Sequence, residues 1–157
     1  MALNLAEVWP VVRDHRLSVH DYIDRCNFRK VAETIRRANF GIADQEDRQA
    51  RWDVIIDHPG RNITSDEYLQ HECTPHFDAG DLLHLLPLAA TISSIGTQRI
   101  TVALGTIVPG PDGRWVFAIL PAEGGGRNLE LVPYDFQWTG ACCFIKVPAF
   151  RKERHIG

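Results

Sequence analysis

The sequence predicts a single α+β domain over residues 1–157, in which N-terminal helices (about 4–94) pack on one face of a C-terminal antiparallel sheet. Three observations predict this class. The chain has 157 residues and is 45% hydrophobic, which is enough to build one hydrophobic core. Up to about residue 95 the apolar residues recur mainly at helical spacing. After Gly96 they alternate along short runs that end in Gly and Pro turns. About four strands are expected, at 99–108, 114–120, 128–132 and 141–147.

The first helical region is predicted to start at Ser18. Its hydroxyl can accept hydrogen bonds from the first-turn amides, and Asp21 suits the positive end of a helix. The apolar residues that follow form two stripes, which are rotated by roughly 150° if each residue turns the helix by ~100°. One straight surface helix cannot bury both stripes. We therefore predict two helices, 19–26 and 28–38, with Asn27 capping the second; the alternative is one helix covered on both sides.

Three further segments complete the N-terminal half. Residues 52–57 are either the end of a helix that begins in the charged run 43–51 or a short buried strand. A short helix is expected from residue 65 to about 70–73, where a Thr-Pro pair closes it. The stretch 78–94 is predicted to form one helix with a kink near Pro87, because proline lacks the amide donor and crowds the preceding turn.

The C-terminal half shows the alternation of β-strands. Residues 100–105 alternate large apolar side chains with smaller ones, and Ile107 falls out of step, so a β-bulge is expected near Gly105. Short connections between the strands favour antiparallel neighbours. The charged residues 151–157 are expected to fray. The buried face of the sheet is expected to come largely from Trp115, Phe117, Ile119, Leu129, Leu131, Phe144 and Ile145.

Charge and cysteine usage limit the class of protein. The 17 Lys and Arg residues against 20 Asp and Glu residues give a net charge of -3, which argues against a general nucleic-acid binder. The start of the chain shows no secretory signal, and the longest uncharged stretch, 82–98, is too polar to span a membrane. The four cysteines form no CxxC pair, and the adjacent Cys142 and Cys143 should point to opposite faces of a strand. We therefore expect no disulfide framework and a soluble protein of the reducing cytoplasm.

The densest set of potentially reactive side chains lies between His71 and Asp78 and includes Cys73 and His76. Imidazole, thiolate and carboxylate groups bind zinc and similar divalent metals, and they also occur in thiol nucleophiles with their bases. If this segment holds a metal, His71, His76 and Asp78 are the expected ligands. The spacing matches no known metal motif, so the alternative is a polar loop in which Cys73 is a small buried side chain.

Two other features suggest binding of anions. Arg25, Arg29 and Arg36 would share one face of a continuous helix, but nearby carboxylates favour internal pairing, and nucleic acid is not an expected partner. Three consecutive glycines stand ahead of Arg127 in the connection 121–127. The strand pattern that follows them favours a flexible hairpin over a phosphate-binding loop, although the loop can still contact a ligand.

Large aromatic residues gather in the connection before the last strand, where they are more typical of an interface or a pocket wall than of a main core; the alternative is a satellite cluster that covers the edge of the sheet. We therefore predict a non-enzymatic binding module that holds a protein partner or a small ligand, without a cofactor or a membrane partner. Self-association into a homo-oligomer would cover the edges of the sheet. The alternative is a small metal-dependent or thiol hydrolase that uses the segment 71–78. The expected binding residues are Trp115, Tyr134, Phe136, Trp138 and Arg127.

Overall fold

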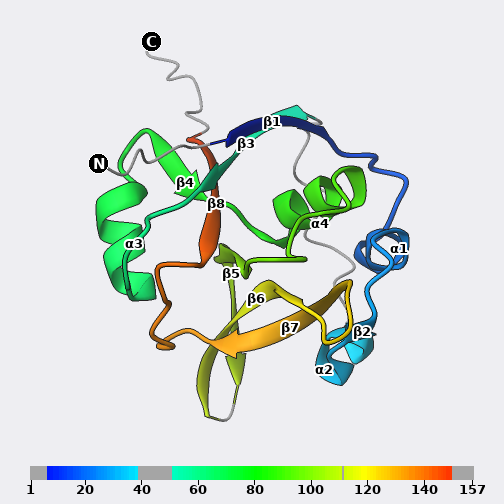
Figure 1. The fold of residues 1–157 in the computed structure, drawn as a ribbon. Helices are drawn as coiled ribbons and strands as arrows, with labels where there is room; N and C mark the ends of the chain where they lie inside the picture. Colours follow the sequence, from blue (N-terminus) through cyan, green and yellow to red (C-terminus); the bar gives the residue numbers. More distant parts are fainter. Residues whose placement is uncertain (1–6, 39–50, 111, 150–157) are drawn as a thin grey trace.

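The computed structural model describes residues 7–38, 51–110 and 112–149. Within these ranges the chain forms one mixed sheet of eight strands and four helices (Figure 1). The strands are β1 (Glu7–Val12), β2 (Lys30–Val31), β3 (Arg51–Asp57), β4 (Phe77–Ala79), β5 (Thr101–Gly110), β6 (Gly113–Pro121), β7 (Arg127–Pro133) and β8 (Cys143–Pro148). The helices are α1 (Val19–Arg25), α2 (Glu33–Arg37), α3 (Ser65–Glu72) and α4 (Leu82–Thr91).

The prediction of N-terminal helices (about 4–94) on a four-stranded antiparallel sheet is wrong. The strand order is β1-β3-β8-β5-β6-β7-β2, with β4 also paired to β8, so four of these strands come from the N-terminal half. The pairs β5–β8 and β2–β7 are parallel. β1 escapes detection because Pro10 interrupts its apolar run, and an edge strand tolerates proline. β2 and β4 have only two and three residues, too few to show a period.

The four C-terminal strands are confirmed, but their arrangement is not the expected one. β5, β6 and β7 form the antiparallel meander that short connections favour. The longer connection 134–142 carries the chain across, so that β8 inserts between β3 and β5. The expected bulge in β5 is confirmed by a register shift between Ala103 and Ile107. Gly105 is needed there, because a Cβ atom would lie 2.5 Å from the carbonyl oxygen of Ala79.

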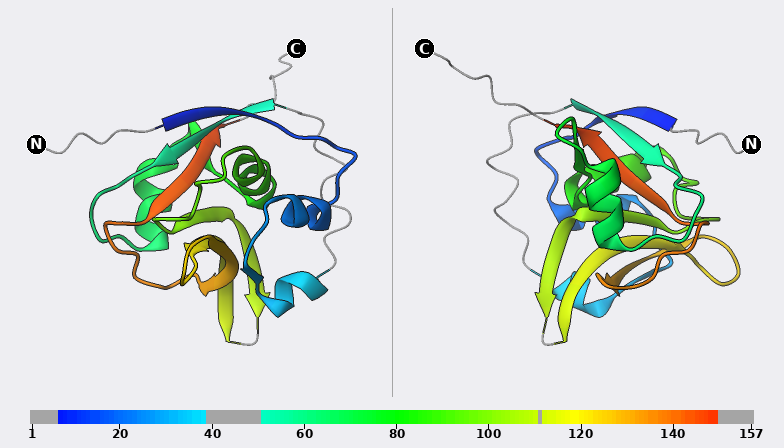
Figure 2. Two further views of the ribbon diagram at one scale, coloured as in Figure 1. Left: turned by 45° about the vertical axis from the view of Figure 1, so that its right-hand side comes forward. Right: turned by 90° about the vertical axis from the view of Figure 1, so that its left-hand side faces the viewer.

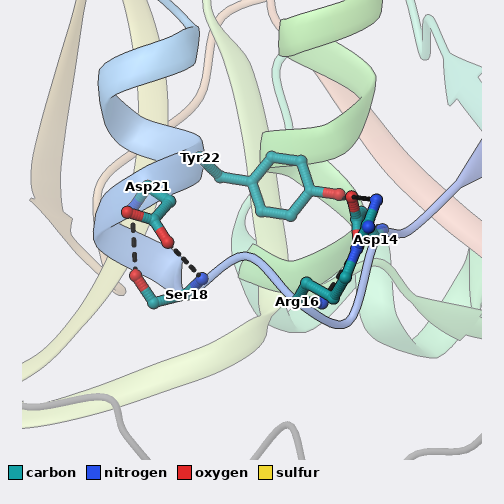
Figure 3. Close-up of polar contacts among 5 residues, drawn as sticks. All are labelled: Asp14, Arg16, Ser18, Asp21 and Tyr22. Atoms are coloured by element: carbon teal, nitrogen blue, oxygen red, sulfur yellow. Dashed lines mark hydrogen bonds and ion pairs between the residues drawn. The ribbon is translucent and has the colours of Figure 1, made fainter.

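The N-terminal helices are shorter than predicted. Ser18 caps α1 as expected, and its hydroxyl accepts from the amide of Asp21 at 3.0 Å (Figure 3). Such a cap contributes about 1 kcal/mol. Asn27 does not cap a second helix: it adopts a positive φ of 54° and turns the chain into β2. The predicted helix 28–38 is therefore wrong, because it divides into β2 and the five-residue α2.

The start of α1 is also fixed to the preceding turn. In Figure 3 the Tyr22 side chain reaches from the helix toward Asp14, and its hydroxyl accepts from the Asp14 amide at 2.7 Å. The Asp14 carboxylate accepts two hydrogen bonds from the Arg16 guanidinium, each 3.0 Å long. These hydrogen bonds lower the pKa of Asp14 to about 2.

The segments between residues 52 and 94 match the sequence prediction only in part. Residues 52–57 belong to a strand, β3, rather than to a helix end, and α3 confirms the helix expected from residue 65. The single helix at 78–94 is wrong: β4 ends at Ala79, and Asp81 then caps the shorter α4, which includes Pro87. Gly80 allows this break, since a Cβ atom there would lie 2.6 Å from a side-chain carbon of Ile145.

Helices cover both faces of the sheet, not one. In Figures 1 and 2, α3 lies on the opposite side of β8 from α1 and α4. Along β6 the alternation separates two cores: Phe117 and Ile119 face α1 and α4, whereas Val116 and Ala118 face the cluster that contains Tyr68 of α3. Of the residues expected to be buried, Phe117, Ile119, Leu129, Phe144 and Ile145 are almost fully enclosed, and Trp115 and Leu131 are half-buried.

In the described ranges no helix combines the length and apolar character needed to cross a membrane. The predicted C-terminal tail 151–157 and the charged run 43–51, apart from its last residue, lie outside the described residues.

Candidate active site

A cleft of about 810 Å³ lies where β1, β3 and β8 meet the segment between α4 and β5. This volume is within the range of sites that bind small molecules. Ile56, Ile92 and Ile95 form part of its apolar lining. Its polar lining includes Glu7, His58, Arg99 and Cys143, together with the indole of Trp9.

Strand pairing brings Cys143 and His58 together. β3 and β8 are antiparallel, with Ile56 opposite Ile145 and Asp57 opposite Phe144. Continued by one residue, this register sets His58, just after β3, opposite Cys143, the first residue of β8. The side chains of His58 and Cys143 lie on the same face of the sheet. Each is two residues from an isoleucine, Ile56 or Ile145, and both isoleucines point into the same core. The Sγ of Cys143 lies 3.1 Å from Nδ1 of His58.

A third side chain, from the edge strand β1, lies beside His58. Glu7, the first residue of β1, is paired with Ile56, so its side chain reaches the imidazole from the side away from the thiol. Its Oε2 lies 3.3 Å from Nε2 of His58. Its Oε1 accepts a hydrogen bond of 3.3 Å from the Trp9 indole. Both carboxylate oxygens of Glu7 are therefore engaged.

These contacts select one tautomer of His58. A carboxylate can only accept, so the imidazole proton belongs on Nε2, where it points at Glu7. Nδ1 is then left with a lone pair and can accept the proton of the Cys143 thiol. A nucleophile, a base and a group that orients the base therefore stand in line, which is the arrangement of covalent catalysis by a thiol.

The protonation state of the thiol determines how such a site would work. Cys143 is 3% exposed, and burial raises its pKa to about 11, although the charge and a hydrogen bond of Arg99 act in the opposite direction. The resting group is therefore a neutral thiol near pH 7. The thiol must pass its proton to His58 as it attacks, so the site is suited to general-base catalysis rather than to a preformed thiolate.

Among the described residues that line the cleft, Arg99 is the one Lys or Arg side chain. It lies two residues before Thr101, which is the parallel partner of Cys143 in β8. Its Nη1 is 3.4 Å from Nδ1 of His58. A guanidinium only donates, so Arg99 competes with the thiol for that lone pair and stabilises negative charge beside it.

The structure does not bring His71, His76 and Asp78, the metal ligands predicted from the sequence, together into a metal site. His71 lies in the last turn of α3, His76 precedes β4, and Asp78 lies within β4. In the part of the chain that the structure describes, no three His, Cys, Asp or Glu side chains are placed to hold a metal ion. Burial raises the pKa of the nearby Cys73 thiol to about 11.

The predicted aromatic binding residues divide between core and surface. Trp138 is fully buried and donates to the Ser65 hydroxyl at 3.0 Å, and Tyr134 is 5% exposed. Phe136 is exposed and packs edge-on against Trp138. Trp115 and Tyr134 line a second cleft, of about 420 Å³, near the turn of the β5–β6 hairpin.

Arg127, the first residue of β7, does not line this second cleft, and it is only 5% exposed. Its guanidinium donates to four main-chain carbonyls, at 2.8 to 3.2 Å, so it ties the end of α1 to the end of α4 and the segment after it. The acceptors are the carbonyl oxygens of Cys26, Ala89, Ile92 and Ile95.

The sequence carries only a partial signal for the cleft. His58 follows an apolar run and Cys143 begins another, so each side chain is placed at the end of a candidate strand. Nothing local indicates that these two strands are neighbours, nor that the strand of Glu7 exists. Comparison of the chain with protein-family models, with curated proteins and with solved structures found no match.

Proposed function

We propose that this protein is a thiol-dependent hydrolase or acyltransferase in which Cys143 is the nucleophile and His58 the general base and acid. The observation that carries the proposal is the 3.1 Å contact between Sγ and Nδ1 inside a cleft large enough for a small substrate. Glu7 is a positioning residue, because its carboxylate holds the imidazole through Nε2.

The reaction would proceed in two halves. Sγ attacks the carbonyl carbon of an ester, thioester or amide while its proton passes to Nδ1 of His58. The tetrahedral intermediate collapses, the leaving group takes that proton from His58, and a thioester to Cys143 remains. A water or a second nucleophile then attacks the thioester, again with His58 as base, and the thiol of Cys143 is restored.

The proposal is tested with 4-nitrophenyl acetate. We expect release of nitrophenolate together with acetylation of Cys143, located by peptide mass spectrometry. Cys143→Ala should abolish this acetylation, and His58→Ala should slow it by about 100-fold, because a general base contributes at least that factor. Cys73→Ala is the matched control and should behave as the parent protein. Burial also raises the pKa of that thiol, but no His of the described residues is hydrogen-bonded to it.

Two results would overturn the proposal. One is acetylation spread over the other cysteines with Cys143 unmodified. The other is a rate of Cys143 acetylation that is the same in His58→Ala and in the parent protein.

A reducing compartment keeps a nucleophilic thiol in its free form, and all four cysteines are free. We therefore propose that the protein works in the cytoplasm. Acylation activity is measured before and after mild oxidation. We expect oxidation to abolish the activity and dithiothreitol to restore it.

A second candidate function is the binding of a small ligand at the cleft beside the β5–β6 hairpin. It is supported by the position of Trp115 and Tyr134, over whose ring the Arg114 guanidinium lies at 4.0 Å. A fragment screen by NMR should shift the Trp115 indole signal, and Trp115→Ala should remove those responses. Responses that persist in this variant would exclude the site.

A further inference from the structure

The feature that the proposed reaction leaves unused is the charge of Arg99. Its side chain is exposed at the cleft, and among the described residues no carboxylate lies within ion-pair distance of it. Its guanidinium contacts the site at two points: Nη1 lies 3.4 Å from Nδ1 of His58, and a hydrogen bond reaches the thiol of Cys143. A guanidinium carries five N–H donors in a rigid plane, so most of its donor capacity is directed elsewhere.

Glu7, the one carboxylate among the described residues of the cleft lining, does not neutralise this cation. Glu7 is held by Trp9 on one oxygen and by His58 on the other, and it lies beyond the imidazole as seen from the thiol. The thiol is neutral in the resting site. The end of the cleft that holds Sγ is therefore positive, and the far end is negative.

We propose that the cleft selects substrates that carry a carboxylate close to the reacting carbon, and that Arg99 binds it. This inference rests on the proposed nucleophilic role of Cys143. The guanidinium is near both Nδ1 and Sγ, so a carboxylate bound there leaves the neighbouring carbon of a short acyl or alkyl group in front of the thiol. A planar fork of donors matches a carboxylate in two parallel hydrogen bonds, which a lysine cannot reproduce.

A competing role for Arg99 is to stabilise the thiolate alone. This role also follows from its position, since Arg99 acts against the rise in the pKa of Cys143. The two roles differ in one measurable respect. Stabilisation of the thiolate changes the reactivity of Cys143 toward every electrophile, whereas a carboxylate site changes it only toward anionic ones.

The experiment uses iodoacetate and iodoacetamide, which are alike in size and differ in charge. Rates of alkylation are measured for each cysteine by peptide mass spectrometry on the folded protein. We expect the ratio of the iodoacetate rate to the iodoacetamide rate to be at least tenfold higher at Cys143 than at Cys73. Arg99→Met should lower the ratio at Cys143 about tenfold, which corresponds to about 1.4 kcal/mol. Arg99→Lys should give an intermediate ratio.

The controls separate this inference from the proposed function. The ratio at Cys73 should be the same in all variants, and thermal melting confirms that each variant is folded. An unchanged ratio in Arg99→Met, or equal loss of both rates, would overturn the carboxylate site while Cys143 kept its His58-dependent reactivity. If neither reagent modified Cys143 in the folded protein, the nucleophile and the carboxylate site would both be wrong.

Discussion

Removal of the Arg127 guanidinium provides a direct test of the packing behind the cleft. Arg127→Met keeps a long apolar side chain in place and deletes four hydrogen bonds to main-chain carbonyls. These carbonyls belong to the ends of α1 and α4 and to the segment after α4, where helical partners are lacking. The variant therefore leaves several buried acceptors unsatisfied.

The size of the effect follows from this geometry. A hydrogen bond to a charged group contributes about 1.5–3 kcal/mol, but the four bonds share one buried cation whose desolvation opposes them. That cost is visible in Arg127 itself, since burial lowers its pKa. We expect a loss of about 3–5 kcal/mol, because each buried carbonyl left without a partner costs about 1–3 kcal/mol and removal of the buried cation's desolvation cost offsets part of that sum. A domain has only about 5–15 kcal/mol of stability, so this is a large fraction of the total.

Urea unfolding followed by circular dichroism measures the loss. Arg127→Lys should fall between the parent protein and Arg127→Met, because an ammonium keeps the charge but not the fork of donors. Arg37→Met is the matched control: it breaks an exposed pair with Glu33 and should cost no more than about 0.5 kcal/mol. If Arg127→Met unfolded at the same urea concentration as this control, the structural role assigned to Arg127 would be wrong.

Three further predictions concern the cleft and the sheet. Glu7→Gln should slow acylation of Cys143 about tenfold, because it weakens a half-exposed hydrogen bond to His58 by about 1.4 kcal/mol. Trp9→Phe, which removes only the indole donor to Glu7, should have a smaller effect, and equal rates in both variants and the parent protein would exclude an orienting role for Glu7. Alkylation of Cys143 by iodoacetamide should keep rising above pH 9, since its pKa is raised to about 11 and the thiolate forms only as the pH approaches that value; a plateau near pH 7 would contradict this pKa. Gly105→Ala should destabilise the protein by about 1–3 kcal/mol in thermal or urea unfolding, because the new Cβ atom would meet the carbonyl oxygen of Ala79; a neutral substitution would mean that the bulge does not hold β4 there.

Local patterns predicted the segments whose own residues decide their structure. The four C-terminal strands are short apolar or alternating runs bounded by turn residues, and the starts of α1 and α3 have side-chain caps. The bulge in β5 was likewise visible, because Ile107 leaves the alternation. In each case the relevant interaction spans only a few residues, so the sequence near it contains the information.

The errors occur where distant segments decide the structure. The segment 28–38 favours a helix locally, but pairing of Lys30 and Val31 with β7 converts part of it into a strand. The segment 78–94 begins as β4 because β8 offers an unpaired stretch beside Phe77–Ala79. Tertiary pairing here overrides local propensity, and the same long-range pairing also assembles the cleft.

The geometry of the cleft is set by the pattern of the two cores rather than by the cleft residues themselves. In β3 and β8, Ile56 and Ile145 point into one apolar core, whereas Asp57 and Lys146 form a 3.3 Å ion pair on the other face. If either strand slipped by one residue, its side chains would move to the opposite face of the sheet. The ion pair would then be broken and one of its charges would enter the apolar core, at a cost of several kcal/mol. The register that avoids this cost also places His58 beside Cys143. The contact proposed to carry the chemistry is thus held by burial of neighbours that take no part in it.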